Sequence, residues 1–261
     1  MLRQIKVLTL VGQSFLLWYN HDKSMKLAIK YIVKFNRGVS MTDKNQLGIQ
    51  YMQEGKYEDA AKAFSEAIEE NPKESIYYVN FGNLLSAVGE TEKALKFYDK
   101  AIELDEKIAA AYYGAGTVYY NQGNYKQAKE KFELSVKNGL DNGDTYFMLG
   151  MTYLQIEQPR LALPYFQRAV EVAEEDVEAR FQFALCLASL SMIDEAIKQF
   201  LIVTEKDPEH ADAYYNLGVA YAGYKEDAKK ALEMFDQALT IQPDHLLAGN
   251  GKKIVQESLG K

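Results

Sequence analysis

Three stretches of this sequence share one pattern: YYGAGTVY at 112–119, YFMLGMTY at 146–153 and YYNLGVAY at 214–221. In each stretch an aromatic residue, a small or apolar residue, a glycine and a second aromatic residue fall at i, i+3, i+4 and i+7. This spacing places the four side chains on one face of an α-helix. A second set with helical spacing follows at 128–135. The sequence therefore predicts pairs of short helices.

The pattern returns with a period of 34 residues along most of the chain. A period in this range is typical of a solenoid, in which helical units stack and bury their apolar faces against one another. Small residues on facing helices leave room for a ring to insert between them. Steps of 34 residues link Gly218, Ala184, Gly150, Gly116, Gly82 and Gly48, and likewise Phe200, Phe166, Phe132, Tyr98 and Phe64.

Glycine and proline residues mark the helix ends. Gly123, which Gly55 and Gly89 match one and two repeats earlier, lies between the two predicted helices. Glycine is favoured there because it adopts a left-handed backbone conformation at little cost. Pro164 lies inside a predicted second helix. A proline there removes one backbone hydrogen bond and costs about 3 kcal/mol in a straight helix, so we expect a kink.

These residues resemble the signature of the tetratricopeptide repeat family, carried here by Tyr112, Ala115, Gly116, Tyr119, Ala128 and Phe132. The resemblance covers about four-fifths of the chain and implies an all-α, right-handed superhelical solenoid of tandem helix-turn-helix repeats. Lys44 and Arg180 depart from it by replacing the first aromatic residue, and the last repeat has one extra residue. The expected repeats are 41–74, 75–108, 109–142, 143–176, 177–210 and 211–245.

Two segments lie outside the repeats. Residues 246–261 are expected to form a capping helix, with an apolar stripe of Leu246, Leu247, Ile254, Val255 and Leu259. Residues 1–40 carry seven Lys or Arg and one acid, with a mostly apolar run from Val7 to Tyr19. Three interpretations stay open for them: a signal-like or anchor-like segment that associates with a membrane through residues 1–20, a basic surface-binding segment, or a stretch that precedes a natural start at Met41.

Charge and composition exclude several classes of function. The chain has 30 Lys and Arg against 37 Asp and Glu, and because residues 1–40 are basic, residues 41–261 have a net charge of −13. Such an acidic body repels phosphate backbones, so nucleic acid is excluded as a partner. Cys186 is the one cysteine, and no phosphate-binding loop, nucleophile elbow or HExxH motif occurs. We therefore expect a cytoplasmic, non-enzymatic protein without cofactor or metal.

Function is then expected to come from shape. The family resemblance implies that the first helix of each repeat lines a concave groove. Exposed apolar residues in such a groove favour a bound peptide as their cover, although close packing between helices is an alternative explanation. The candidate groove residues occupy positions 5, 6 and 9 of the repeats: Asn45, Ile49, Val79, Asn80, Asn83, Tyr113, Thr117, Met151, Phe147, Phe181, Leu185, Tyr215, Asn216 and Val219.

Acidic residues at position 2 are expected to form the rim of this groove. They are Asp144, Glu178 and Asp212. The rim predicts an apolar peptide ligand with Lys or Arg residues, whereas an equally weighted alternative is that these acids only stabilise their helices through the dipole. The predicted role is that of an adaptor or scaffold. A weakly self-associating structural protein and a membrane-tethered assembly factor are the alternatives.

Overall fold

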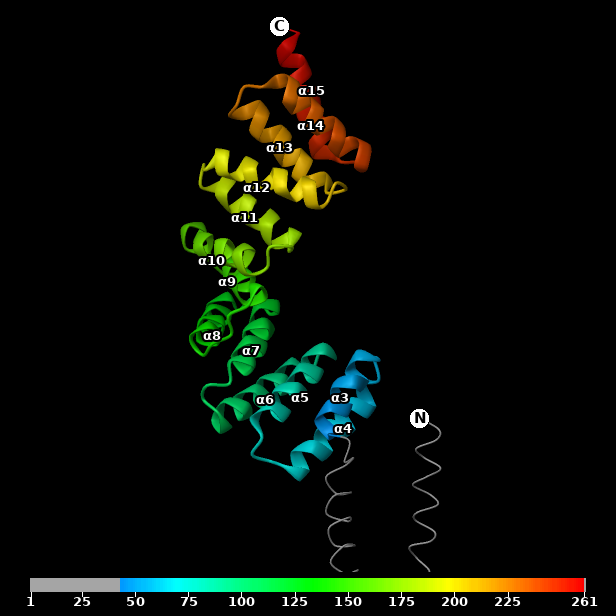
Figure 1. Ribbon diagram of the computed structural model, residues 1–261, viewed down its shortest axis with the longest axis vertical. Coiled ribbons are helices and arrows are strands. Elements are labelled where there is room, and N and C mark those ends of the chain that lie inside the picture. The colour runs from blue at the N-terminus through cyan, green and yellow to red at the C-terminus, as the bar shows by residue number, and fades with distance from the viewer. Residues whose placement is uncertain (1–42, 261) are drawn as a thin grey trace, which may run out of the picture. The chain divides into compact units, whose positions relative to one another are not determined.

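The computed structural model describes residues 43–260, and these form thirteen α-helices and no strand (Figure 1). The predicted all-α tandem helical repeat is therefore confirmed. The expectations for residues 1–40 lie outside the described residues. The described chain divides after Pro72 into two compact units, which are treated separately below.

The helices alternate as the sequence period predicts. Successive first helices begin 34 residues apart from α5 to α13, and successive second helices do so from α4 to α12. The first helices are α3 (Lys44–Gln53), α5 (Ser75–Ala87), α7 (Ala109–Asn121), α9 (Gly143–Gln155), α11 (Val177–Ser189) and α13 (Ala211–Gly223). The second helices are α4 (Tyr57–Glu70), α6 (Thr91–Leu104), α8 (Tyr125–Lys137), α10 (Pro159–Val172), α12 (Ile193–Lys206) and α14 (Ala228–Ile241), and α15 (Leu246–Leu259) follows.

The first unit is the helix pair α3 and α4. Its two helices pack so closely that a Cβ atom on Gly48 would stand 2.5 Å from the ring of Phe64, which is fully buried. Lys44, which replaces the usual aromatic residue, forms an ion pair with Glu66 of α4. The departure from the repeat signature is thus compensated by a charged contact between the same two helices.

In the second unit, each helix packs against the next one along the chain, from α5 to α15. The pairing depends on small residues opposite a ring. A Cβ atom on Gly116 of α7 would lie 2.8 Å from the ring of Phe132 in α8, and Phe132 has no exposed surface. The expected insertion of Phe132 is confirmed. Removal of such a ring costs about 3–5 kcal/mol because of the lost burial and the cavity left behind.

The turn between first and second helices has the left-handed backbone that the glycine pattern predicts. Gly123 has a φ of 75°, its amide donates to the carbonyl of Tyr120, and the amide of Asn124 donates to the carbonyl of Tyr119. These two bonds satisfy the last carbonyls of α7. Glu157 and Ser191 occupy the same turn position in later repeats with φ of 60° and 61°, without the freedom of glycine.

The last repeat absorbs its extra residue in this turn. The amide of Asp227 reaches back to the carbonyl of Tyr221 over 3.0 Å, one residue further than in the other repeats. Beyond the turn the usual packing returns, because a Cβ atom on Gly218 would lie 2.5 Å from the ring of Phe235. The insertion is therefore local to the turn.

Arg180 takes over the contact of the aromatic residue that it replaces. In the third repeat the hydroxyl of Tyr112 donates to the carbonyl of Glu106 over 3.1 Å. Arg180 donates through Nη2 to the carbonyl of Glu174 over 3.2 Å, which is the same residue spacing. The guanidinium group thus anchors α11 to the loop before it, as the phenol anchors α7.

Helix α10 continues on both sides of Pro164, whose side chain is exposed, and a kink at this residue stays a prediction.

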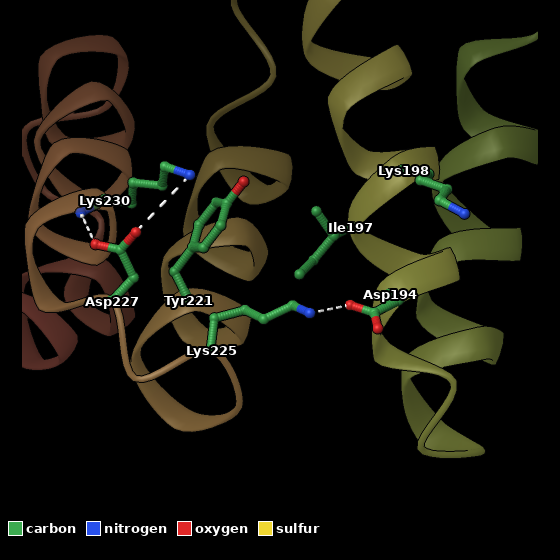
Figure 2. A pocket seen from close by; sticks show the side chains of 7 residues that line it. All are labelled: Asp194, Ile197, Lys198, Tyr221, Lys225, Asp227 and Lys230. Atoms are coloured by element: carbon green, nitrogen blue, oxygen red, sulfur yellow. Dashed lines mark hydrogen bonds and ion pairs between the residues drawn. The ribbon is translucent and has the colours of Figure 1, made fainter.

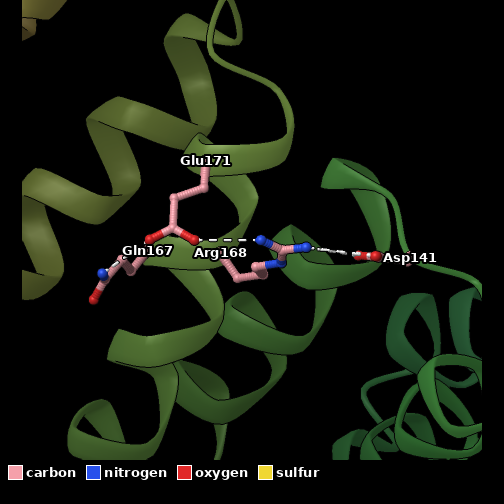
Figure 3. A network of polar contacts seen from close by, with 4 residues as sticks. All are labelled: Asp141, Gln167, Arg168 and Glu171. Carbon is pink, nitrogen blue, oxygen red and sulfur yellow. Dashed lines mark hydrogen bonds and ion pairs between the residues drawn. The ribbon is translucent and has the colours of Figure 1, made fainter.

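Figure 3 shows Arg168 of the same helix between two carboxylates, with Nη2 3.4 Å from Asp141 and Nη1 3.4 Å from Glu171. Gln167 also donates to Glu171, over 3.0 Å. Because all these groups are largely exposed, the ion pairs contribute little to the stability of the fold.

The expected apolar stripe of the capping helix is wrong for four of its five residues. Leu246, Leu247, Ile254 and Leu259 are between 57% and 80% exposed, whereas Val255 is buried. The helix approaches α14 through small residues instead, because a bulky side chain at the contact would collide with the ring of Phe235.

Candidate functional site

Positions 2, 5 and 9 of each first helix lie on one side of it, because residues at i, i+3 and i+7 share a helix face. We call this surface the rung face. In α5 to α13 the rung face carries apolar, aromatic, amide and acidic residues, and neither Lys nor Arg occurs at these positions. Two of its rows run from helix to helix about 10 Å apart, since positions 2 and 9 are seven residues apart at about 1.5 Å each.

The position-5 residues form an aromatic ladder that packs on the second helices. The ring centroids of Phe147 and Phe166 are 6.1 Å apart, and those of Phe181 and Phe200 are 5.8 Å apart. Tyr113 and Tyr215 make the same contact in their own repeats, at 5.6 and 6.2 Å. Packing between helices, the alternative explanation raised by the sequence, therefore accounts for part of this ladder.

Three predicted groove residues have little surface to offer a ligand. Asn45, Val79 and Phe181 are 5%, 2% and 8% exposed. Their expected exposure is wrong: Val79 and Phe181 belong to the hydrophobic core between the packed helices, and Asn45 is buried as well. Tyr113, Phe147 and Tyr215 stay half-buried and keep part of each ring accessible.

The position-9 row changes from polar to apolar along the second unit. Asn83 is exposed, but its amide oxygen accepts the hydroxyl hydrogen of Tyr98 over 2.8 Å. The hydroxyl of Thr117 donates to the carbonyl of Tyr113. The later members of the row are Met151 and Leu185, both half-buried, and Val219, which is 40% exposed. In the first unit Ile49 is half-buried at the same position.

The two asparagine candidates at position 6 of the repeats, Asn80 and Asn216, are only partly exposed. Asn216 donates through Nδ2 to the carbonyl of Asp212 over 2.7 Å, and its side chain is half-buried. Asn80 is also half-buried. Neither residue therefore presents its whole side chain to a ligand.

The three acidic rim residues are all exposed and lie in the first turns of α9, α11 and α13. Glu178 accepts a hydrogen bond from Gln182 of its own helix over 2.9 Å. Burial raises the pKa of the Tyr113 phenol, and the negative charge of Asp144 raises it further. Asp144 thus acts electrostatically on a residue of the preceding rung, while stabilisation of the helix dipole explains the position of all three acids equally well.

Two histidines have a structural role that the sequence interpretation missed. His210 and His245 precede α13 and α15, and Nδ1 of each ring accepts the amide hydrogen of a residue in the first turn, Ala213 or Ala248. Nε2 of His245 lies 3.1 Å from Oδ1 of Asp212. Since Nδ1 of His245 is an acceptor, Nε2 carries the hydrogen and donates it to that carboxylate. The recurring Pro-x-His at the ends of these repeats was the signal available in the sequence.

A hollow of about 570 Å³ lies away from the rung face, between α12, α13 and α14, and Figure 2 shows the side chains that line it. Four of its five charged groups form two ion pairs, and the fifth is the exposed Lys198. Lys225 forms an ion pair with Asp194, and Lys230 lies 3.8 Å from Asp227 and 5.2 Å from the ring centroid of Tyr221. These contacts stabilise the turn before α14 and leave the hollow without an obvious ligand chemistry.

Side chains that could together hold a metal ion do not assemble in residues 43–260. Within that range no three His, Cys, Asp or Glu side chains come together as potential metal ligands. The thiol of Cys186 is buried and donates to the carbonyl of Pro159 over 3.4 Å, and burial raises its pKa to about 11. It is therefore protonated at neutral pH. None of the helices between residues 43 and 260 has the length and apolarity to cross a membrane.

Comparison with known proteins identifies the repeat. The crystal structure of YrrB, described as a TPR protein with an unusual peptide-binding site, is 60% identical, with a TM-score of 0.70 over 74% of this chain and 99% of that one. A curated relative, the TPR repeat-containing protein YrrB of Bacillus subtilis (strain 168), is 64% identical over 39 residues, which cover 15% of this chain and 19% of that protein.

The pilF structure from Pseudomonas aeruginosa has a TM-score of 0.68 at 22% identity, over 79% of this chain and 94% of that one, and supports the fold alone. Models of the tetratricopeptide repeat match residues 44–74, 107–175 and 191–245, and a TPR repeat model matches 82–123. Proteins with these repeats are generally non-catalytic interaction modules. Taken with its helix pairs and their period, these matches show that the chain belongs to the tetratricopeptide repeat family.

Proposed function

We propose that this chain is a non-enzymatic cytoplasmic adaptor that binds an extended or helical segment of a partner protein on its rung face. The observation that supports this most is the chemistry of that face. It combines partly exposed aromatic and aliphatic side chains with three exposed carboxylates, and it contains no lysine or arginine. The described peptide-binding site of the 60% identical YrrB points to the same class of ligand.

The proposed ligand is an apolar segment with Lys or Arg residues. Apolar side chains of the ligand would cover the position-9 row, where Val219 is 40% exposed. Basic side chains would lie near the carboxylates of the position-2 row, because opposite charges across an interface set orientation and suppress wrong partners. The face has no cationic residue to hold a terminal carboxylate, so a segment inside the partner chain fits as well as its end.

A selection from a displayed random peptide library on the full chain tests the proposal. We expect enriched peptides to combine bulky apolar residues with Lys or Arg. They should lose affinity for Val219→Glu and keep it for Leu201→Glu, a matched control, because Leu201 is 44% exposed but lies on the second helix α12. Peptides that bind the Val219 variant normally and lose the Leu201 variant would contradict the proposed site.

The electrostatic part has its own test. Charge reversal at Asp144 and Glu178, both exposed, should weaken the basic peptides while the protein still unfolds cooperatively. Unchanged affinity would remove the carboxylates from the proposal and leave only their effect on the helix dipole.

Self-association is the alternative, and it has support in exposed apolar residues of the second helices. Leu161 of α10 is 51% exposed and Leu201 of α12 is 44% exposed. Sedimentation velocity at several protein concentrations separates the two functions. A concentration-independent monomer favours the adaptor, whereas reversible growth that Leu161→Ser abolishes favours association through the second helices.

A further inference from the structure

The C-terminal helix α15 occupies the place of a seventh first helix. It follows α13 by 35 residues, as the sixth repeat is one residue longer than the others. His245 caps its start through Nδ1, as His210 caps α13. Ala248 is fully buried at the third position of α15, as Ala213 is at the third position of α13.

The packing of α15 repeats that of an internal first helix. At its sixth position, a Cβ atom on Gly251 would lie 2.6 Å from the ring of Phe235 in the preceding second helix. Gly114 stands at the same position of α7, where a Cβ atom would lie 2.5 Å from the ring of Tyr98. Moreover, α15 contacts both α14 and α13, just as α7 contacts both α6 and α5.

This register decides which side of α15 closes the array and which side continues the rung face. Positions 4 and 8, which face a second helix in the complete repeats, hold Gly249 and Lys253, and nothing lies within 4 Å of a Cβ atom built on Gly249. That side is open and polar. Positions 2 and 9 hold Leu247 and Ile254, which are 57% and 66% exposed.

The position-2 and position-9 rows of the rung face end in exposed apolar residues at α15, whereas position 5 changes from the aromatic ladder to Asn250. The position-9 row ends in Val219 and Ile254, with increasing exposure of 40% and 66%. The position-2 row carries three carboxylates and then changes to Leu247.

We propose that α15 is the last rung of the binding face and takes bulky apolar side chains at one end of the bound segment. The occupant is a partner segment with Lys or Arg side chains over Asp144, Glu178 and Asp212, followed by a bulky apolar residue over Leu247 and Ile254. Charge complementarity argues for this order, because the position-2 row changes from carboxylates in α9, α11 and α13 to Leu247 in α15. The inference rests on the proposed function, since it extends the same face.

The test uses the full chain and the peptides that the library selection enriches on it. Ile254→Ser is compared with Leu259→Ser on the same helix, because Leu259 is 62% exposed but lies outside positions 2, 5 and 9. Both side chains are exposed, so neither change is expected to unfold α15, which a thermal melt checks. Covering one isoleucine is expected to strengthen binding by about tenfold or more, so Ile254→Ser should weaken it by that factor.

The outcomes separate the inference from the function on which it rests. Peptides that lose affinity for Val219→Glu and Ile254→Ser but not Leu259→Ser support both. Peptides that lose affinity for Val219→Glu alone overturn the proposed role of α15 and leave the proposed binding on the rung face intact. The absence of enriched peptides overturns both proposals. The sedimentation coefficient is a further check. If it rises with protein concentration, and if Ile254→Ser and Leu259→Ser both abolish that rise, α15 mediates contact between copies of the chain and the inference is overturned.

Discussion

Replacement of Ser191 by glycine is expected to stabilise the fifth repeat. Ser191 occupies the left-handed turn position with a φ of 61°, and its side chain is exposed. A residue with a Cβ atom adopts this conformation at a cost of about 1–2 kcal/mol. The backbone of the turn is held by two hydrogen bonds, from Ser191 to the carbonyl of Ala188 and from Met192 to that of Leu187, both 2.9 Å.

The net effect is smaller than the conformational cost. Glycine has more conformational freedom than serine in the unfolded chain, and this reduces the gain in folding stability by about 0.5–1 kcal/mol. No side-chain packing is lost because the serine is exposed. The Ser191→Gly variant should therefore be more stable by about 0.5–1 kcal/mol, and Gly123→Ala, the reverse change in the third repeat, should be less stable by a similar amount.

Urea unfolding, together with native-state hydrogen exchange of α11 and α12, measures the effect. The exchange data are needed because repeat stability is a sum of local terms, so the gain should concentrate in the helices that flank the turn. A lower stability of Ser191→Gly, or no loss in Gly123→Ala, would refute the view that the left-handed backbone limits this turn.

Three further changes have defined outcomes. His245→Ala removes the acceptor for the amide of Ala248 and should cost about 0.5–2 kcal/mol, seen as faster amide exchange that is greatest in α15. Phe132→Ala should cost about 3–5 kcal/mol in urea unfolding because the ring is fully buried; a loss below 1 kcal/mol would contradict its role in the core. Cys186, whose pKa burial raises to about 11, should resist a thiol reagent at pH 8 and react more readily as the pH approaches that value or after urea unfolding. Rapid labelling of the folded protein at pH 8 would show that the thiol is accessible.

Helical spacing and the 34-residue period were together enough to predict stacked helix pairs, because that period connects positions that must all meet the same neighbours. The sequence pattern predicted that Gly116 faces Phe132 and that Gly123 lies in the left-handed turn between the two helices. Both are found in the structure. The turns at Glu157 and Ser191 were not predicted, since no residue there favours a positive φ. The backbone hydrogen bonds that end the first helix hold this conformation. Because they involve backbone atoms alone, the residue type does not reveal them.

The candidate site was harder to predict than the fold. Helical spacing identifies which residues share a face, but the exposure of Phe181 at 8% or Val219 at 40% depends on how closely the helices approach and which rings fill the gap. The C-terminal stripe failed for a related reason. Sequence periodicity shows that apolar residues are present in α15, whereas the contact of Gly251 with Phe235 decides that they point away from the core.

The longer turn before α14 has a practical consequence for labelling this protein. Helix pairing survives an added residue there, since Gly218 and Phe235 still meet and Asp227 still finds a carbonyl partner. The last repeat thus keeps the contacts between its two helices, although the turn between them is one residue longer than in the other repeats. An epitope or a fluorophore inserted beside Glu226, an exposed residue, would report on the molecule from a loop that already accommodates additional length.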